Sequence, residues 1–222
     1  MRRQLALLVS LIGCSPALLR AQATNVTGAG RTGPRALLPR DHEIALARSA
    51  APAAVSDSAT IYVLGQQGYS VAVQGTSGVA CYVGRSWPAS VEPHCFDAEG
   101  AATILPMEMR RTEQLHRGVP YDSIQRDIAV GLLQGRYRVP QRPAMSWMMS
   151  ASQRLIDDDG RVVGAWKPHL MIYYPYLTRA ALGLGPTPDP RQAILVDGGT
   201  PESNLLIILG SFVQSADSTG KR

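Results

Sequence analysis

The stretch GVACYVGRSWPASVEPHCFD, residues 78–97, holds two of the three cysteines in this 222-residue chain. Two runs of β-branched, aromatic and small residues flank a segment that contains proline, which is typical of a β-hairpin. A register that places Cys81 opposite Cys95 leaves the five-residue loop SWPAS at the tip. Opposed residues in antiparallel strands have Cβ atoms about 4.5–5.5 Å apart, close to what a disulfide needs. We therefore expect a Cys81–Cys95 disulfide across a hairpin.

The same stretch has a second interpretation as a chemical site, because His94 directly precedes Cys95. A structural zinc site usually has four ligands with at least one closely spaced pair such as C-x₂-C, and that pair is missing here. Consecutive residues of a strand also point to opposite faces, which separates His94 from Cys95. A metal site or a nucleophilic thiol is therefore the weaker interpretation, and we expect no metal.

The first residues predict export. The chain begins with MRRQ, continues with the apolar run LALLVSLIG and reaches small residues that end in AQA. This pattern is typical of a signal peptide, here residues 1–23, cleaved before Thr24. The alternative is lipidation, because LIGC, residues 11–14, resembles a lipobox and would anchor the chain to a membrane through Cys14. Either route predicts a periplasmic or extracellular protein, where oxidised cysteines persist.

The charge of the chain argues against a nucleic-acid partner. The whole sequence has 22 basic and 17 acidic residues, but Arg2, Arg3 and Arg20 belong to the predicted signal peptide, which leaves 19 basic residues. No basic tract remains, so nucleic-acid binding is not expected. We expect a membrane contact only if Cys14 is lipidated, and otherwise an envelope protein or a small ligand as partner.

The pattern beyond the signal peptide predicts one domain. Residues 24–40 lack any apolar period and are expected to be a disordered arm, residues 41–213 suffice for a single core, and residues 214–222 are expected to be a disordered tail. Apolar and β-branched runs predict strands at residues 60–64, 69–75, 78–84, 91–97, 145–150, 169–177, 193–198 and 204–212. Helical patterns begin at Asp41 and cover residues 106–118 and 120–136.

Strands, then helices, then strands again indicate an α+β fold with a mainly antiparallel sheet of short strands and two or three helices packed on it. The first three strands are expected to form an antiparallel meander. The helix over residues 120–136 is expected to pack on the sheet, with Gly131 permitting a close approach.

The second dense stretch is PHLMIYYPY, residues 168–176. A histidine at the mouth of a strand, near Trp166 and several tyrosines, is a candidate general base, so His169 is the candidate catalytic residue. Its plainer interpretation is a partly buried histidine bonded to a backbone carbonyl. Tyr173, on the same side of the strand, and Trp87, at the hairpin tip, are candidate ligand-binding residues.

Motifs for known chemistries are missing. The sequence has no G-x-S-x-G and no phosphate-binding loop with its lysine, so no cofactor is expected. The leading hypothesis is an exported, disulfide-stapled domain with a binding or accessory role. The alternative is an exported hydrolase that uses His169 with a carboxylate from residues 92–108.

Four segments together resemble a group of exported bacterial proteins that have no assigned activity. They are GTSGVACYVGR, EPHCFDAEG, MSWMMS and PHLMIYYPY, and the similarity covers residues 43–209. The resemblance implies one coherent domain and transfers no catalytic residue to this chain.

Overall fold

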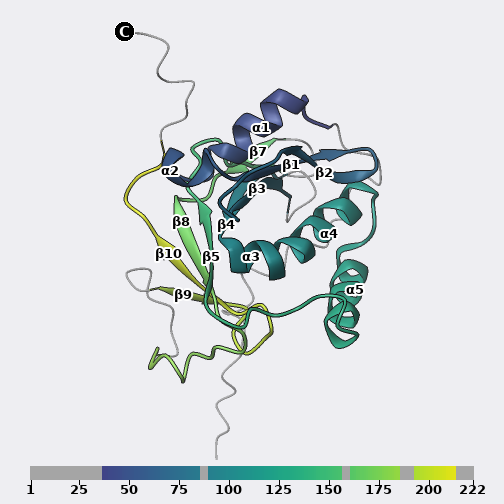
Figure 1. Ribbon diagram of the computed structural model, residues 1–222. Helices are drawn as coiled ribbons and strands as arrows, with labels where there is room; N and C mark the ends of the chain where they lie inside the picture. The colour runs from purple at the N-terminus through teal and green to yellow at the C-terminus, as the bar shows by residue number, and fades with distance from the viewer. Residues whose placement is uncertain (1–36, 86–89, 157–160, 186–192, 214–222) are drawn as a thin grey trace, which may run out of the picture. The chain divides into compact units, whose positions relative to one another are not determined.

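The computed structural model describes residues 37–85, 90–156, 161–185 and 193–213, all of which belong to one compact unit. Eight described strands form one mixed sheet in the order β2-β1-β3-β4-β5-β8-β10-β9 (Figure 1). Their bounds are β1 (Thr60–Gly65), β2 (Gly68–Val73), β3 (Ala80–Gly84), β4 (Glu92–Phe96), β5 (Ala144–Met148), β8 (His169–Tyr173), β9 (Ile194–Val196) and β10 (Asn204–Ile208). Strands β6 (Leu155–Ile156) and β7 (Val162–Gly164) pair separately. The expected α+β class with a mainly antiparallel sheet is confirmed.

The described helices are α1 (Arg40–Arg48), α2 (Ala53–Ser56), α3 (Ala98–Thr103), α4 (Leu105–His116) and α5 (Tyr121–Leu133). Helix α1 packs on β1, β3 and β4, while α3 and α4 pack on strands β2 to β5. Helix α5 packs chiefly on α4, so the expectation that it lies directly on the sheet needs correction (Figure 1). No described helix has the length and apolar character needed to span a membrane.

The first three strands do not form a meander. Strand β2 pairs antiparallel with β1, but β3 pairs with β1 on its other side and runs parallel to it. The connection from β2 to β3 therefore crosses the start of β1, where the Thr76 amide donates to the Ser58 carbonyl oxygen at 2.8 Å. A Cβ on Gly75 would lie 2.2 Å from the backbone nitrogen of Thr60, so only glycine fits this crossing.

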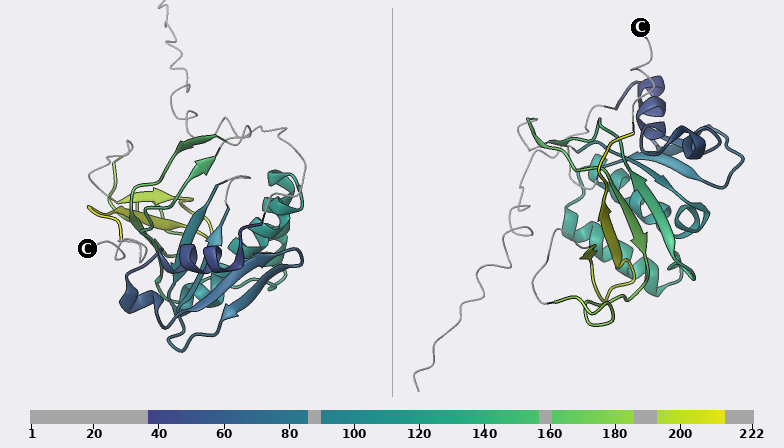
Figure 2. Two further views of the ribbon diagram at one scale, coloured as in Figure 1. Left: turned by 90° about the horizontal axis from the view of Figure 1, so that it is seen from above. Right: turned by 90° about the vertical axis from the view of Figure 1, so that its left-hand side faces the viewer.

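The hairpin of β3 and β4 has the expected register, with Cys81 opposite Cys95 and Tyr82 opposite His94. Because side chains alternate along a strand, the cysteines face α1, while Tyr82 and Phe96 face the other helices. Strands of both halves of the chain continue from this hairpin into one sheet (Figure 2).

The sheet separates two apolar cores. The core on the α3–α5 side is built mainly from large side chains, namely Tyr82, Phe96, Ile104, Leu105, Met107, Leu115, Ile124, Ile128 and Tyr173. The core on the α1 side is built from smaller ones, namely Leu46, Ala47, Ala50, Ala51, Ala59, Ile61, Cys81, Val83 and Cys95. The two helix layers therefore meet the sheet through different kinds of side chain.

Candidate functional site

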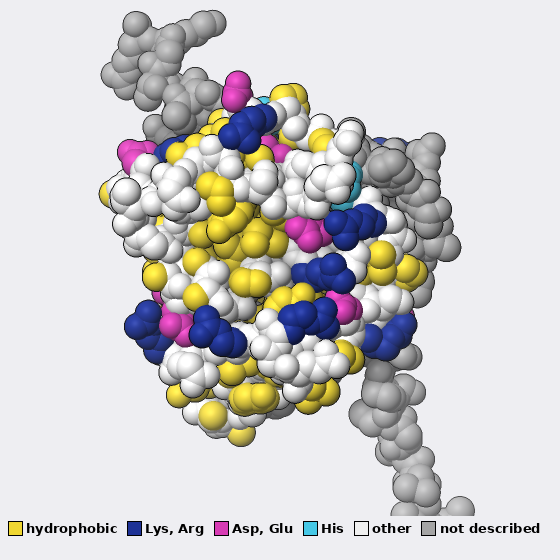
Figure 3. Space-filling view, turned by 45° about the vertical axis from the view of Figure 1, so that its right-hand side comes forward, with side chains coloured by type: hydrophobic (Ala, Val, Ile, Leu, Met, Phe, Trp, Pro, Cys, Tyr) yellow, Lys and Arg dark blue, Asp and Glu magenta, His cyan; other side chains and the backbone are white. Residues whose placement is uncertain are grey.

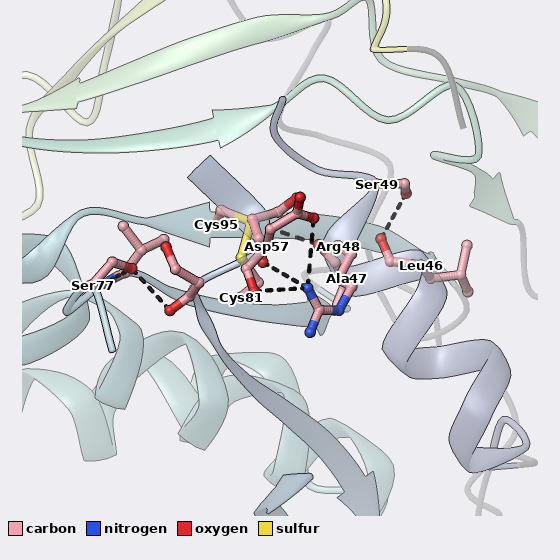
Figure 4. Close-up of a disulfide and its surroundings, with 11 residues drawn as sticks. Leu46, Ala47, Arg48, Ser49, Asp57, Ser77, Cys81 and Cys95 are labelled. Atoms are coloured by element: carbon pink, nitrogen blue, oxygen red, sulfur yellow. Dashed lines mark hydrogen bonds and ion pairs between the residues drawn. A yellow bond between two sulfur atoms is a disulfide. The ribbon is translucent and has the colours of Figure 1, made fainter. Parts of the chain in front are cut away.

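The predicted disulfide is present. The Cys81 and Cys95 sulfur atoms are bonded, and both residues are fully buried. The Cys95 sulfur lies 3.6 Å from the carbonyl oxygen of Ala47 in α1, so the helix backbone covers the bond (Figure 4). A disulfide this deeply covered is out of reach of exchanging thiols, and the pair acts as a structural cross-link.

The end of α1 that covers the disulfide is anchored in turn. The Arg48 guanidinium donates to the carbonyl oxygens of Ser56 at 3.0 Å and Asp57 at 3.2 Å, and the Ser49 hydroxyl donates to the Leu46 carbonyl (Figure 4). These contacts satisfy groups near the helix C-terminus and hold the chain that leads into β1. The α1 side of the sheet is thus a closed, cross-linked layer.

His169 begins strand β8 and is 3% exposed. Its Nδ1 lies 2.7 Å from the Lys167 carbonyl oxygen. Since a carbonyl only accepts, Nδ1 carries the proton and Nε2 keeps the lone pair. Among the described residues, no carboxylate or serine hydrogen-bonds to this ring. Burial lowers the pKa of His169, against the raising effect of the Lys167 carbonyl. This matches the plainer interpretation of the histidine.

His94 lies near His169, on the side of the sheet that faces α3 and α4, and is 7% exposed. Its ring stacks on Phe96 at 5.7 Å between centroids and meets the edge of Tyr82 at 5.5 Å. Burial lowers the pKa of His94 to about 3, and a charge on His169 would lower it further. The ring is therefore neutral at physiological pH and serves as a packing group in the aromatic core.

Glu92 completes this buried polar region. It is 3% exposed, and its Oε1 accepts a hydrogen bond from Trp166 Nε1 at 3.1 Å. The Trp166 ring in turn meets the edge of the His169 ring, with 6.5 Å between centroids. Within the described residues, no three His, Cys, Asp or Glu side chains are grouped as metal ligands. These side chains pin the start of β8 to β4.

A groove of about 900 Å³ lies on the α5 side of the molecule, away from the two histidines. Its wall is α5, and its other sides come from α3, from the loop after α5 and from the turn before β10. The size is in the range of small-molecule sites. A smaller hollow of about 340 Å³ lies beside α1 and α2. The larger groove is the best-formed candidate for a functional site in the described part of the chain.

Arg111 of α4 forms the polar floor of this groove. Its Nη1 donates to Glu108 at 2.7 Å, its Nη2 donates to both carboxylate oxygens of Glu202 at 2.6 and 2.7 Å, and its Nε donates to Gln125 at 3.0 Å. Burial alone would lower the pKa of Arg111, but Glu108 and Glu202 together hold it above its ordinary value. One guanidinium thus ties α4, α5 and the turn before β10 together.

The turn before β10 is itself held by local hydrogen bonds. The Asp197 carbonyl oxygen accepts from the hydroxyls of Thr200 at 2.7 Å and Ser203 at 2.8 Å. The Thr200 carbonyl accepts from the backbone amide of Tyr176 at 2.8 Å. Tyr176 has φ 61°, a left-handed conformation that costs energy for a non-glycine residue and that its surroundings must enforce. Tyr176 is 60% exposed and lines the groove.

Tyr137 supplies a second aromatic side chain to the groove. Its ring lies against the backbone of α5 at Gly131, where an added Cβ would come within 2.5 Å of the ring. On the same ring, the Arg136 guanidinium lies 5.3 Å from the centroid, and Arg136 pairs with Asp127 at 3.1 Å. The close approach expected at Gly131 therefore exists, but the partner is Tyr137 rather than the sheet.

The predicted site residues do not come together in this groove. His169 is buried elsewhere in the sheet, and Tyr173 is a core residue at 4% exposure with a pKa that burial raises well above its ordinary value. Trp87 and Cys14 lie outside the described residues. Sequence patterns missed Arg111 and Glu202 because they are 91 positions apart and meet only through the fold.

No family model, curated protein or solved structure matches this chain.

Proposed function

We propose that the chain is an exported, disulfide-stapled binding domain of the bacterial envelope, and that its ligand occupies the groove beside α5. The observation that carries the proposal is a groove of about 900 Å³ whose floor is held in place by the Arg111 hydrogen bonds. A preformed apolar groove with a few fixed polar groups is the usual form of a small-molecule site, because little ordering is needed on binding. The buried disulfide supports the export part of the proposal.

Binding is favoured over hydrolysis by the placement of the titratable groups. His169 is buried, bonded to a backbone carbonyl and absent from the groove lining. The groove carboxylates are already occupied, since Glu202 binds Arg111 and Glu99 pairs with Arg142 at 3.1 Å. A general base must reach a substrate proton, but His169 does not line the groove, and Glu99 and Glu202 are each held by an arginine.

The binding part of the proposal is tested with the neutral fluorescent probe N-phenyl-1-naphthylamine. Ala129 is an exposed residue of the α5 wall, so Ala129→Trp fills the groove without entering the core. Ala54 is an equally exposed helical alanine outside the groove, and Ala54→Trp is the matched control. We expect the wild type and the control to bind the probe and Ala129→Trp to lose most of this binding. Equal probe binding by all three proteins would overturn the assignment of the groove.

Export is tested separately by expressing the full chain in a Gram-negative host. The mass of the recovered protein should correspond to a chain that begins at Thr24, in the periplasmic fraction. A lipidated N-terminus at Cys14 would establish the alternative processing route. An uncleaved chain in the cytoplasm would contradict export.

A further inference from the structure

Two acidic side chains, Glu99 and Glu202, and two basic ones, Arg111 and Arg138, line the groove. Glu99 pairs with Arg142 and also accepts from the Gln141 amide at 2.9 Å, while Arg111 and Glu202 bind each other. Arg138 is the fourth charged side chain of the lining. It is exposed, and among the described residues it has no hydrogen bond or ion pair. Arg138 is therefore the charged side chain of the lining that remains available to a ligand, at the side of the groove formed by the loop after α5.

The α5 wall of the groove is mainly apolar. The α5 residues Ile128, Ala129, Leu132 and Leu133 line it in succession. Leu133 is 89% exposed, the highest exposure among the large apolar side chains described. A run of apolar side chains along one wall of a groove, rather than this leucine alone, gains from contact with an apolar ligand. The face that carries α4 and α5 shows such apolar patches among arginines and carboxylates (Figure 3).

We infer that the groove takes a single-chain amphiphile with one anionic headgroup, with the chain along the α5 wall and the head at Arg138. This inference rests on the proposed function, since it names the class of ligand for the same groove. A guanidinium binds carboxylates and phosphates through paired N–H donors, so either head meets the same chemistry. The half-buried Tyr137 and the exposed Tyr176 suit the boundary between chain and head, because a phenol is apolar along its body and polar at its tip.

One feature of the structure favours a cationic headgroup instead. Asp197 lies near Glu202, and burial raises the pKa of its carboxyl, with Glu202 raising it further. The surplus of carboxylates around Arg111 would attract a cationic head instead. Asp197 does not line the groove, however, whereas Arg138 does. The anionic head is therefore the better fit, and a cationic probe tests the other outcome.

The test is competition against N-phenyl-1-naphthylamine by four twelve-carbon ligands below their micelle concentrations. Dodecanoate and dodecyl phosphate carry anionic heads, dodecyl maltoside is neutral and dodecyltrimethylammonium is cationic. We expect at least one anionic ligand to bind about tenfold more tightly than the neutral one, the size expected for a charge-assisted hydrogen bond. The ratio of the two anionic affinities distinguishes a carboxylate source from a phosphate source.

Arg138→Gln should remove this preference and leave the affinity for dodecyl maltoside unchanged. Arg126, an exposed arginine of α5 outside the groove, gives the matched control Arg126→Gln, which should keep the preference. Equal affinity for all heads, a cationic preference, or an anionic preference that survives Arg138→Gln would overturn the inference while the groove still binds. Loss of binding for every ligand and for the neutral probe would overturn the proposed function as well.

Discussion

The two faces of the sheet are covered in different ways. On one face, alanines let α1 approach until its backbone touches the disulfide, and Ala47, Ala50, Cys81 and Cys95 are all fully buried. On the other face, aromatic rings lie between the sheet and its helices, α5 packs on α4, and Arg111 of α4 binds Gln125 of α5 and Glu202. Small residues close a layer, whereas bulky and charged ones hold helices apart and leave room for a groove.

The largest effect is expected from replacing Arg111, which holds the groove side together. Arg111→Met leaves Glu108 and Glu202 near each other without their shared cation. Breaking a buried ion pair costs about 3–5 kcal/mol, and we expect the lower end, about 3 kcal/mol, because the Glu108 and Glu202 side chains are 21% and 20% exposed. The free energy of unfolding, measured by urea denaturation, should fall by this amount. Arg110 is the matched control, because it pairs with Asp127 at 2.9 Å in a half-exposed setting.

Arg110→Met should lower stability by only about 0–1 kcal/mol, as is usual for surface pairs. A similar loss in both variants would mean that the Arg111 network is not what holds the groove floor.

The α1 face is tested by removing its cross-link. The double variant Cys81→Ala/Cys95→Ala should lower the free energy of unfolding by about 3 kcal/mol, because the unfolded chain regains the freedom of a 14-residue loop. The wild type treated with reductant under denaturing conditions and then refolded should show a similar loss. Unchanged stability in the double variant would show that packing by α1 suffices without the bond.

A smaller expected effect is a pH dependence of the free energy of unfolding, which arises from Glu108 on the α4 side of the sheet. Burial raises the pKa of Glu108 from 4.5 to about 7, and the charge of Arg111 opposes this shift. The folded protein therefore binds a proton here that the unfolded chain has released, so this contribution to stability is present below pH 4.5 and is lost as pH rises through about 7.

Glu108→Gln stays neutral at every pH. Its free energy of unfolding should therefore rise relative to that of the wild type as pH increases across this window, as measured by urea denaturation at several pH values. Parallel curves for the two proteins would show that Glu108 is charged in the folded state throughout.

Local patterns predicted most of the fold. The alternation in residues 78–97 predicted both the hairpin register and the disulfide, and strands such as β8 and β10 lie where β-branched runs predicted them. Short-range signals could not place β3 beside β1, because that pairing depends on a crossing that only the size of Gly75 makes possible. The brief helix α3 was also missed, although Asp97 caps it by accepting from the Gly100 amide at 2.7 Å.

The candidate site was less accessible to sequence reasoning. The sequence of residues 168–176 suggested a histidine and tyrosines available for chemistry, but the side chains of His169 and Tyr173 are buried in the core. The groove instead depends on Arg111 meeting Glu202 and on Tyr137 reaching Gly131. Neither contact leaves a periodic signal in the sequence, since each depends on how separate elements pack.

The most direct test of the division between a structural face and a binding face compares two variants in one binding assay. The dissociation constant of N-phenyl-1-naphthylamine is measured for Cys81→Ala/Cys95→Ala and for Ala129→Trp, at a temperature at which circular dichroism shows both to be folded. We predict that the cysteine variant keeps the wild-type dissociation constant and that Ala129→Trp weakens binding at least tenfold. Weakened binding in the cysteine variant together with unchanged binding in Ala129→Trp would contradict the account.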